Sequence, residues 1–90
     1  MITVLHNPAA TRFEASVDGL LSVADYALRD RVMTLHHTFV PTALRGRGVA
    51  AALVQEALAH ARAQGLKVEP SCSYVASYMR RHPETQDLHA

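Results

Sequence analysis

The residue types best suited to chemistry lie in a short loop before an alanine-rich stretch, where Gly46 and Gly48 alternate with Arg45 and Arg47. No Ser, Asp or Asn stands where it would cap the helix predicted to follow, so the first backbone N–H groups of that helix lack partners. Free N–H groups, the positive helix end and two guanidinium groups suit a phosphorylated ligand, and glycine lets phosphates approach the backbone. An ordinary strand-to-helix turn with solvated arginines is the alternative that this stretch leaves open.

Cys72 and two adjacent histidines are candidates for catalysis. Cys72 follows Pro70 and lies beside serines that could cap a helix, and a thiol at a helix N-terminus ionises more easily and becomes a nucleophile. A lone cysteine is also commonly a small buried core residue, and both interpretations stay open. His36 and His37 point to opposite faces of one predicted strand, so only one can face a site. Either imidazole could accept a proton from an ammonium group, or be a hydrogen-bonded core residue.

Tyr74 and Tyr78 are one helical turn apart, and a phenol can donate a proton to a leaving group. The alternative is that the two rings pack together. The pattern predicts no metal site, because adjacent strand histidines diverge and no Cys-x-x-Cys or His-x-x-x-His motif supplies further ligands.

Length and composition limit the classes of protein to consider. Ninety residues with a hydrophobic fraction of 49% predict a single domain over residues 1–90, with one modest core. A formal charge of +1 gives no strong field for nucleic acid or an anionic membrane, and neither partner is expected. One cysteine, no secretory signal and no apolar run near the ~20 residues of a membrane span indicate a cytoplasmic protein.

The first half of the chain reads as a series of strands. Residues 1–10 contain a short apolar start and a turn, with an edge strand as one option. Alternation predicts a strand over 12–17, a hairpin turn at Asp18-Gly19, and a return strand over 20–28 whose register is uncertain. A third strand is predicted over 32–40.

The third strand has two predicted faces and a free edge. Four residues are expected to lie on the same face of this strand: Met33, Leu35, His37 and Phe39. Because a proline ends the strand, its last backbone groups are expected to lack a neighbour on one side and to be able to pair with an extended amide ligand.

The second half reads as helix, strand and helix. Apolar residues at helical spacing predict a helix over 47–64, closed by Gly65, then a strand over 66–69 that lies parallel to the third strand. Ser71 or Ser73 is expected to cap a short final helix that runs to His82. The tail beyond Pro83 is expected to be loosely held. The expected fold class is therefore α+β: three antiparallel strands, then a helix, a parallel strand and a short C-terminal helix.

Four segments resemble one family. Arg45-x-x-Gly48-x-Ala50 matches the [QR]-x-x-G-x-[GA] signature of the GNAT N-acetyltransferases. Together with His-Thr-Phe-Val at 37–40, Pro-Ser-Cys-Ser-Tyr-Val at 70–75 and Arg-His-Pro-Glu at 81–84, it resembles the smallest single-domain GNAT-like proteins, the YjdJ type. The likeness runs from about residue 11 to residue 88.

The resemblance implies an acetyl-coenzyme A-dependent N-acetyltransferase with coenzyme A as cosubstrate and an unnamed primary amine as acceptor, either a small molecule or a protein lysine or N-terminus. Backbone N–H groups of the loop and helix start would hold the pyrophosphate, and the strand end would hold the pantetheine. The predicted catalytic residues are Cys72, which the resemblance implies lies beside the thioester, Tyr78, near the place of a proton-donating tyrosine in larger GNAT enzymes, and His37, as a candidate proton acceptor. The cofactor residues are Thr38, Phe39, Val40, Arg45, Gly46, Arg47, Gly48, Val49 and Ala50.

Two other functions remain as alternatives. A coenzyme A or acyl-coenzyme A binding module without efficient turnover is favoured by the absence of the early helices that form an acceptor pocket in larger GNAT enzymes. A nucleic-acid or protein-interaction domain would use the loop arginines with Arg80 and Arg81, but the near-neutral charge and the lack of stacking aromatics count against it. The expected assembly is a monomer or a weak dimer.

Overall fold

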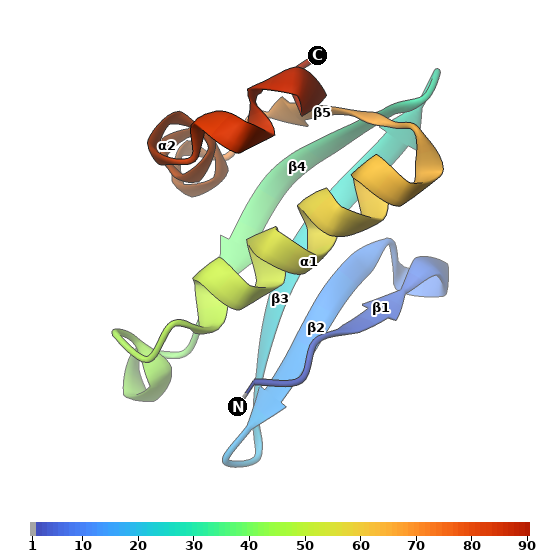
Figure 1. Cartoon of the computed structure of the whole chain (residues 1–90). Coiled ribbons are helices and arrows are strands. Elements are labelled where there is room, and N and C mark those ends of the chain that lie inside the picture. Colours follow the sequence, from blue (N-terminus) through green and yellow to red (C-terminus); the bar gives the residue numbers. More distant parts are fainter. Residues whose placement is uncertain (1) are drawn as a thin grey trace.

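The computed structural model describes residues 2–90 and shows a five-stranded sheet in the order β1-β2-β3-β4-β5. The strands are β1 (Leu5–Asn7), β2 (Arg12–Val17), β3 (Leu20–Arg29), β4 (Val32–Phe39) and β5 (Lys67–Pro70). Helix α1 (Val49–Gln64) connects β4 to β5, and α2 (Ser73–Arg81) follows β5. The first four strands are antiparallel and β5 runs parallel to β4, so the α+β prediction is confirmed (Figure 1).

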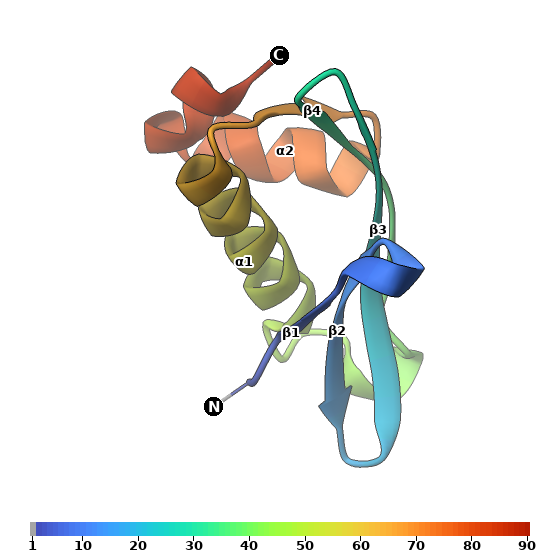
Figure 2. The same cartoon turned by 90° about the vertical axis from the view of Figure 1, so that its right-hand side faces the viewer.

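Both helices cover the same face of the sheet, and Figure 2 shows α1 and α2 together on one side of β2, β3 and β4. The buried side chains of α1 recur at helical spacing, as the apolar pattern predicts; they are Val49, Leu53, Val54, Ala57, Leu58 and Ala61. They pack on strand residues such as Phe13, Met33 and Leu35, each at most 1% exposed. The opposite face of the sheet, called the open face below, carries no helix in the described chain.

Tight turns join the antiparallel strands. Asp18 and Gly19 have φ values of 52° and 76°, the left-handed pair that a two-residue hairpin requires, which confirms the predicted turn. Asp30 and Arg31 form the next turn with φ values of 52° and 63°. The Arg31 guanidinium donates to the carbonyl of Gln64 at 2.6 Å, so this turn is attached to the end of α1.

Edge strand β1 is attached to the helical layer by a cluster of rings. The His6 ring stacks on Phe13 with centroids 4.3 Å apart and meets His60 of α1 at 4.4 Å. His6 Nε2 and the Tyr26 hydroxyl lie 2.7 Å apart. Burial and the nearby His60 lower the pKa of His6.

A β-bulge in β4 overturns one prediction about faces. Asp25 pairs with His37, but the next residue of β3, Tyr26, pairs with Leu35, which leaves His36 as an extra residue in β4. Residues before the bulge keep the predicted alternation, whereas those after it are reversed. Leu35 is fully buried under the helices, but His37 lies on the open face, together with Phe39. The expected common face for Met33, Leu35, His37 and Phe39 is therefore wrong.

Strand β5 pairs with only the first half of β4. Their parallel pairing covers Val32 to Leu35 against Lys67 to Pro70, and the Cys72 N–H then donates to the Leu35 carbonyl at 3.0 Å. β4 continues to Phe39, and in the described chain no strand pairs with that edge beyond Leu35. The predicted free edge at the end of this strand is confirmed.

The C-terminal segment is better attached than the sequence predicts. A 3₁₀ helix spans Pro83–Leu88, with Leu88 only 5% exposed, and the Ala90 N–H donates to the Val68 carbonyl at 2.9 Å. Arg62 of α1 pairs with Asp87 at 2.7 Å. The expectation of a loose tail is wrong, because a buried leucine, an ion pair and a backbone bond hold it. No helix within residues 2–90 has the length and apolarity to cross a membrane.

Candidate active site

The loop before α1 exposes backbone donors as the sequence predicts. After the short 3₁₀ helix Thr42–Leu44, Gly46 and Gly48 both adopt φ values of 82°, and Gly48 is the N-cap of α1 with no side-chain hydrogen bond. Within α1, Ala52 is the first residue whose N–H reaches a backbone carbonyl, that of Gly48 at 3.1 Å. The N–H groups before it at the helix start have no carbonyl to bind in the described chain, and the first turn holds no acidic side chain. This geometry favours an anionic ligand.

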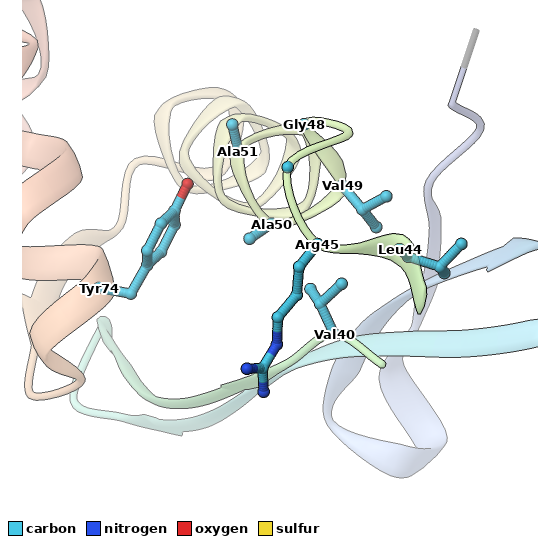
Figure 3. A pocket seen from close by; sticks show the side chains of 9 residues that line it. Val40, Leu44, Arg45, Gly48, Val49, Ala50, Ala51 and Tyr74 are labelled. Carbon is cyan, nitrogen blue, oxygen red and sulfur yellow. The ribbon is translucent and has the colours of Figure 1, made fainter. Parts of the chain in front are cut away.

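A cleft of about 290 Å³ lies against this loop, between the end of β4, the start of α1 and the first turn of α2 (Figure 3). Its lining residues are Val40, Leu44, Arg45, Gly46, Gly48, Val49, Ala50, Ala51 and Tyr74. Six of the nine predicted cofactor residues are among them. The exceptions are Thr38, Phe39 and Arg47.

The two loop arginines have different surroundings. Arg47 Nη1 donates to Asp18 in the β2–β3 turn at 2.8 Å, so its charge is already paired. Arg45 lines the cleft and extends past Val40 in Figure 3, and among residues 2–90 no carboxylate lies within ion-pair distance of it. Arg45 is therefore the loop arginine available to a ligand.

The last two residues of β4 point to opposite faces of the sheet. Thr38 lies on the helical side, where its hydroxyl is 3.7 Å from the Cys72 sulfur. Phe39 lies on the open face and is 49% exposed, away from the residues that line the cleft.

Cys72 occupies the helix position that the serines were expected to take. It is the N-cap of α2 and makes no cap bond through its side chain, while the Ser71 hydroxyl donates to the Leu35 carbonyl at 3.5 Å. The expected serine cap is wrong, because β5 extends the chain to this point and directs Ser71 toward β4. Burial raises the pKa of the Cys72 thiol, but the donors around the sulfur together outweigh it, so the pKa falls below its ordinary value. These donors are the N–H groups of Val75, Tyr74 and Thr38 and the Thr38 hydroxyl. A thiol that ionises more easily is the property the sequence suggested.

His37 is not in the cleft. Its Nδ1 lies 2.9 Å from an Asp25 carboxylate oxygen on the open face, and its side chain is 56% exposed. Its neighbour His36 is the exposed extra residue of the bulge.

The two tyrosines of α2 also separate. Tyr74 lines the cleft and directs its hydroxyl toward the start of α1 in Figure 3. Tyr78 stacks on His82 with ring centroids 4.0 Å apart and borders a second cavity of about 190 Å³, whose other lining residues come from α1 and the Pro83–Leu88 segment. Burial, with Glu84 and Tyr74 nearby, raises the pKa of Tyr78.

The structure thus brings together the loop, Val40 and Tyr74, with Cys72 and Thr38 in contact at the junction of β4 and α2. It separates Tyr78 and His37 from the cleft, and their catalytic roles stay predictions. The partners Asp18 and Asp25 were missed, because their contacts depend on strand register and no local sequence pattern marks them. Among the described residues no group of three His, Cys, Asp or Glu side chains is placed to hold a metal ion.

Comparison with known proteins defines the class. A model of the GCN5-related N-acetyl-transferase family matches residues 12–88, so the chain belongs to this family. The family and the glycine turn before α1 together make it an acetyltransferase-like protein.

Individual relatives agree with this assignment. The chain is 40% identical over 58 residues to Protein NATD1 of Gallus gallus and of Homo sapiens, a match that covers 64% of this chain and 53% and 51% of those proteins. The chain thus spans about half the length of the curated relatives it matches. A GCN5-like protein of Staphylococcus aureus, solved by NMR, superposes with a TM-score of 0.77 at 25% identity, over 98% of this chain and 87% of that one.

Proposed function

We propose that this chain transfers an acetyl group from acetyl-coenzyme A to a primary amine in the cytoplasm. The observation that supports it most is the uncapped start of α1, with its glycine turn, facing a cleft that is also lined by Val40, the residue directly after the free edge of β4. Unpaired N–H groups suit the pyrophosphate, and an unpaired strand edge suits the amides of a pantetheine arm. The residues present therefore fit this cosubstrate, which supplies the acetyl group as a thioester.

Each group near the cleft has a proposed task. Backbone N–H groups of Gly46 and of residues 48–51 bind the phosphates, whereas the Arg47 N–H already donates to the Leu44 carbonyl at 3.3 Å. Arg45 adds a charge-assisted contact. The edge of β4 at residues 38–40 orients the pantetheine. Tyr74 is better placed than Tyr78 to donate a proton to the departing thiolate, because its ring lines the cleft.

Two routes for the acetyl group are compatible with the site. In one, the amine attacks directly, after His37 or a water has taken its proton. In the other, the easily ionised Cys72 receives the acetyl group first and passes it to the amine. The acceptor is a small amine or a protein lysine or N-terminus, and the acting species is a monomer or weak dimer.

The test of the cofactor site is Gly48→Val. A Cβ at Gly48 would meet no protein atom within 4 Å, so it would project into the open space where phosphates approach the backbone. We expect coenzyme A affinity, measured by calorimetric titration, to fall at least about tenfold, the equivalent of one charge-assisted hydrogen bond. The positive φ of 82° adds a folding cost of about 1 to 2 kcal/mol.

Gly19→Val is the matched control for that cost. Gly19 has a φ of 76° and open space around it, but it lies in the β2–β3 turn and does not line the cleft. The Gly19→Val chain should lose about as much unfolding free energy as the Gly48→Val chain and should keep the coenzyme A affinity of the wild-type chain. A folded Gly48→Val chain with unchanged affinity would refute the site.

A coenzyme A-binding module without turnover is the second candidate, favoured because two predicted catalytic side chains, His37 and Tyr78, lie outside the cleft. Thiol release from acetyl-coenzyme A separates the two functions. The candidate amine acceptors to be tested are spermidine, an Nα-blocked lysine and a peptide with a free N-terminus; they are called the amine panel below. Amine-dependent release above the rate of hydrolysis supports the enzyme, whereas tight binding with no amine dependence supports the module.

A further inference from the structure

We infer that Asp25 is a positioning residue for His37, holding one imidazole nitrogen so that the other is presented on the open face to take a proton from the amine. The inference rests on the proposed function and assigns the side of the sheet from which the amine arrives. It follows from one contact, the 2.9 Å approach of His37 Nδ1 to Asp25 Oδ2.

The backbone holds this pair in register. Asp25 of β3 and His37 of β4 lie directly opposite each other across the ladder, so their side chains share a face. The Asp25 side chain is 28% exposed and that of His37 is 56% exposed, so the carboxylate is the more enclosed partner. With Nδ1 donating to Asp25, the lone pair of the neutral ring is on Nε2.

Within residues 2–90, no Arg or Lys side chain forms an ion pair with the Asp25 carboxylate. Arg12 lies directly across from Asp25 on β2, but its guanidinium donates to Glu14 instead. Among residues 2–90, His37 is the side chain that the Asp25 carboxylate bonds. The negative charge is thus available to stabilise a protonated imidazole.

The bulge gives the pair its location. If His36 were paired in a regular ladder instead of bulging out of it, position 37 would face the helices with Leu35, as the uninterrupted alternation predicts. With the bulge, the imidazole projects from the open face at the segment of β4 whose other edge has no partner strand. An amine that approaches this edge from the open face meets no helix of residues 2–90, and the His37 imidazole lies on that face.

The proposed step is a single proton transfer. An N–H bond of the ammonium breaks, its electron pair stays on the amine nitrogen, and the proton bonds to Nε2 of His37. The product imidazolium lies beside the Asp25 carboxylate, which accepts the hydrogen bond of its Nδ1–H. Solvent then takes up the proton and restores the neutral ring.

The first measurement is the tautomer of His37, read by long-range ¹⁵N NMR at about pH 8.5, about two pH units above the ordinary pKa of an imidazole. The expected form has its proton on Nδ1 in the wild-type chain. In Asp25→Ala this preference should disappear, and in Asp30→Asn it should persist. Asp30 is a matched control because it lies in the same hairpin, is 89% exposed, and has a positive φ that asparagine tolerates. A wild-type ring protonated on Nε2 would overturn the inference.

The second measurement is acetylation of the fastest amine from the panel above. Asp25→Ala should lower kcat about 10- to 100-fold, less than the whole contribution of a general base, and change KM for acetyl-coenzyme A by less than about twofold. Full kcat in Asp25→Ala would refute the positioning role while leaving the acetyltransferase intact. No turnover by a wild-type chain with the expected tautomer would instead refute the proposed function, and the catalytic role of Asp25 with it.

Discussion

At the scale of single residues, the chemistry of Cys72 depends on one neighbour from another element. Thr38 of β4 places its hydroxyl 3.7 Å from the sulfur, and the N–H groups of Val75 and Tyr74 in α2 and of Thr38 itself are the other donors near it. Such donors stabilise a thiolate more than a thiol, so they favour reaction at neutral pH. The residue is partly exposed, which gives a reagent access to it.

Thr38→Val tests this contact, because it removes the hydroxyl and keeps the shape of the side chain. We expect alkylation of Cys72 by iodoacetamide at neutral pH to slow about 2- to 10-fold, the worth of one hydrogen bond. The rate is followed by intact mass. Ser77→Ala is the control, since Ser77 lies on α2 without a bond to the sulfur. Equal rates in all three chains would contradict the assigned hydrogen bond.

A second residue-scale prediction concerns the loop arginines. Arg45→Ala should weaken coenzyme A binding by about 1.5 to 3 kcal/mol, the worth of a hydrogen bond to a charged group. Arg47→Ala should weaken it by less, because the Arg47 charge is already paired with Asp18 at 2.8 Å. Calorimetric titration of both variants ranks them. The reverse ranking would show that the Asp18 pair opens when the ligand binds.

At the scale of elements, the sequence predicts what local patterns control. Alternation identifies β2 and most of β4, helical spacing identifies α1, and Asp18-Gly19 marks its hairpin turn. These features depend on backbone preference and side-chain period, which are properties of short segments. The uncapped start of α1 was likewise predictable, because no Ser, Asp or Asn precedes the helix where it could act as a cap.

Features that depend on pairing between distant segments could not be predicted. The bulge at His36 arises from how β3 and β4 align, and adjacent histidines look alike whether or not the strand is interrupted. The Pro83–Leu88 segment is polar apart from its last residue, so its local pattern resembles a free tail. Its attachment comes from Leu88 in the core and Asp87 beside Arg62. The parts of the site formed by one short segment, such as the loop before α1, were therefore predicted. The parts that depend on strand register, such as the position of His37, were not.

At the scale of the whole molecule, the ring cluster that joins β1 to the helical layer makes stability depend on pH. Burial and His60 lower the pKa of His6, so the folded chain prefers its neutral form, while the unfolded chain takes up a proton below about pH 6.5. This contribution is present above that pH and is lost as the pH falls through the lower folded pKa. Tyr26 and His60 are the titratable groups against the ring, and burial raises the pKa of Tyr26 and keeps it neutral.

His60→Gln should reduce this dependence, because it removes one of the two causes of the low pKa. The free energy of unfolding, from urea titrations at about pH 7.5 and pH 5, should fall less on acidification than in the wild-type chain. His89→Gln is the control, as its exposed ring bonds only the neighbouring Ala90 carbonyl. An unchanged loss in His60→Gln would contradict the role of the pair.

The extra residue in β4 also affects how this chain is aligned with its relatives. An alignment that leaves out the one-residue gap at His36 moves each later residue by only one position, yet it exchanges inward and outward positions for the rest of the strand. Thr38, which lies beside the thiol on the helical side, would then be matched to an open-face position, and His37, which lies beside Asp25, to a position on the helical side. Residue roles in this family are therefore transferred safely across this point only when the pairing of the two strands is compared as well as their letters.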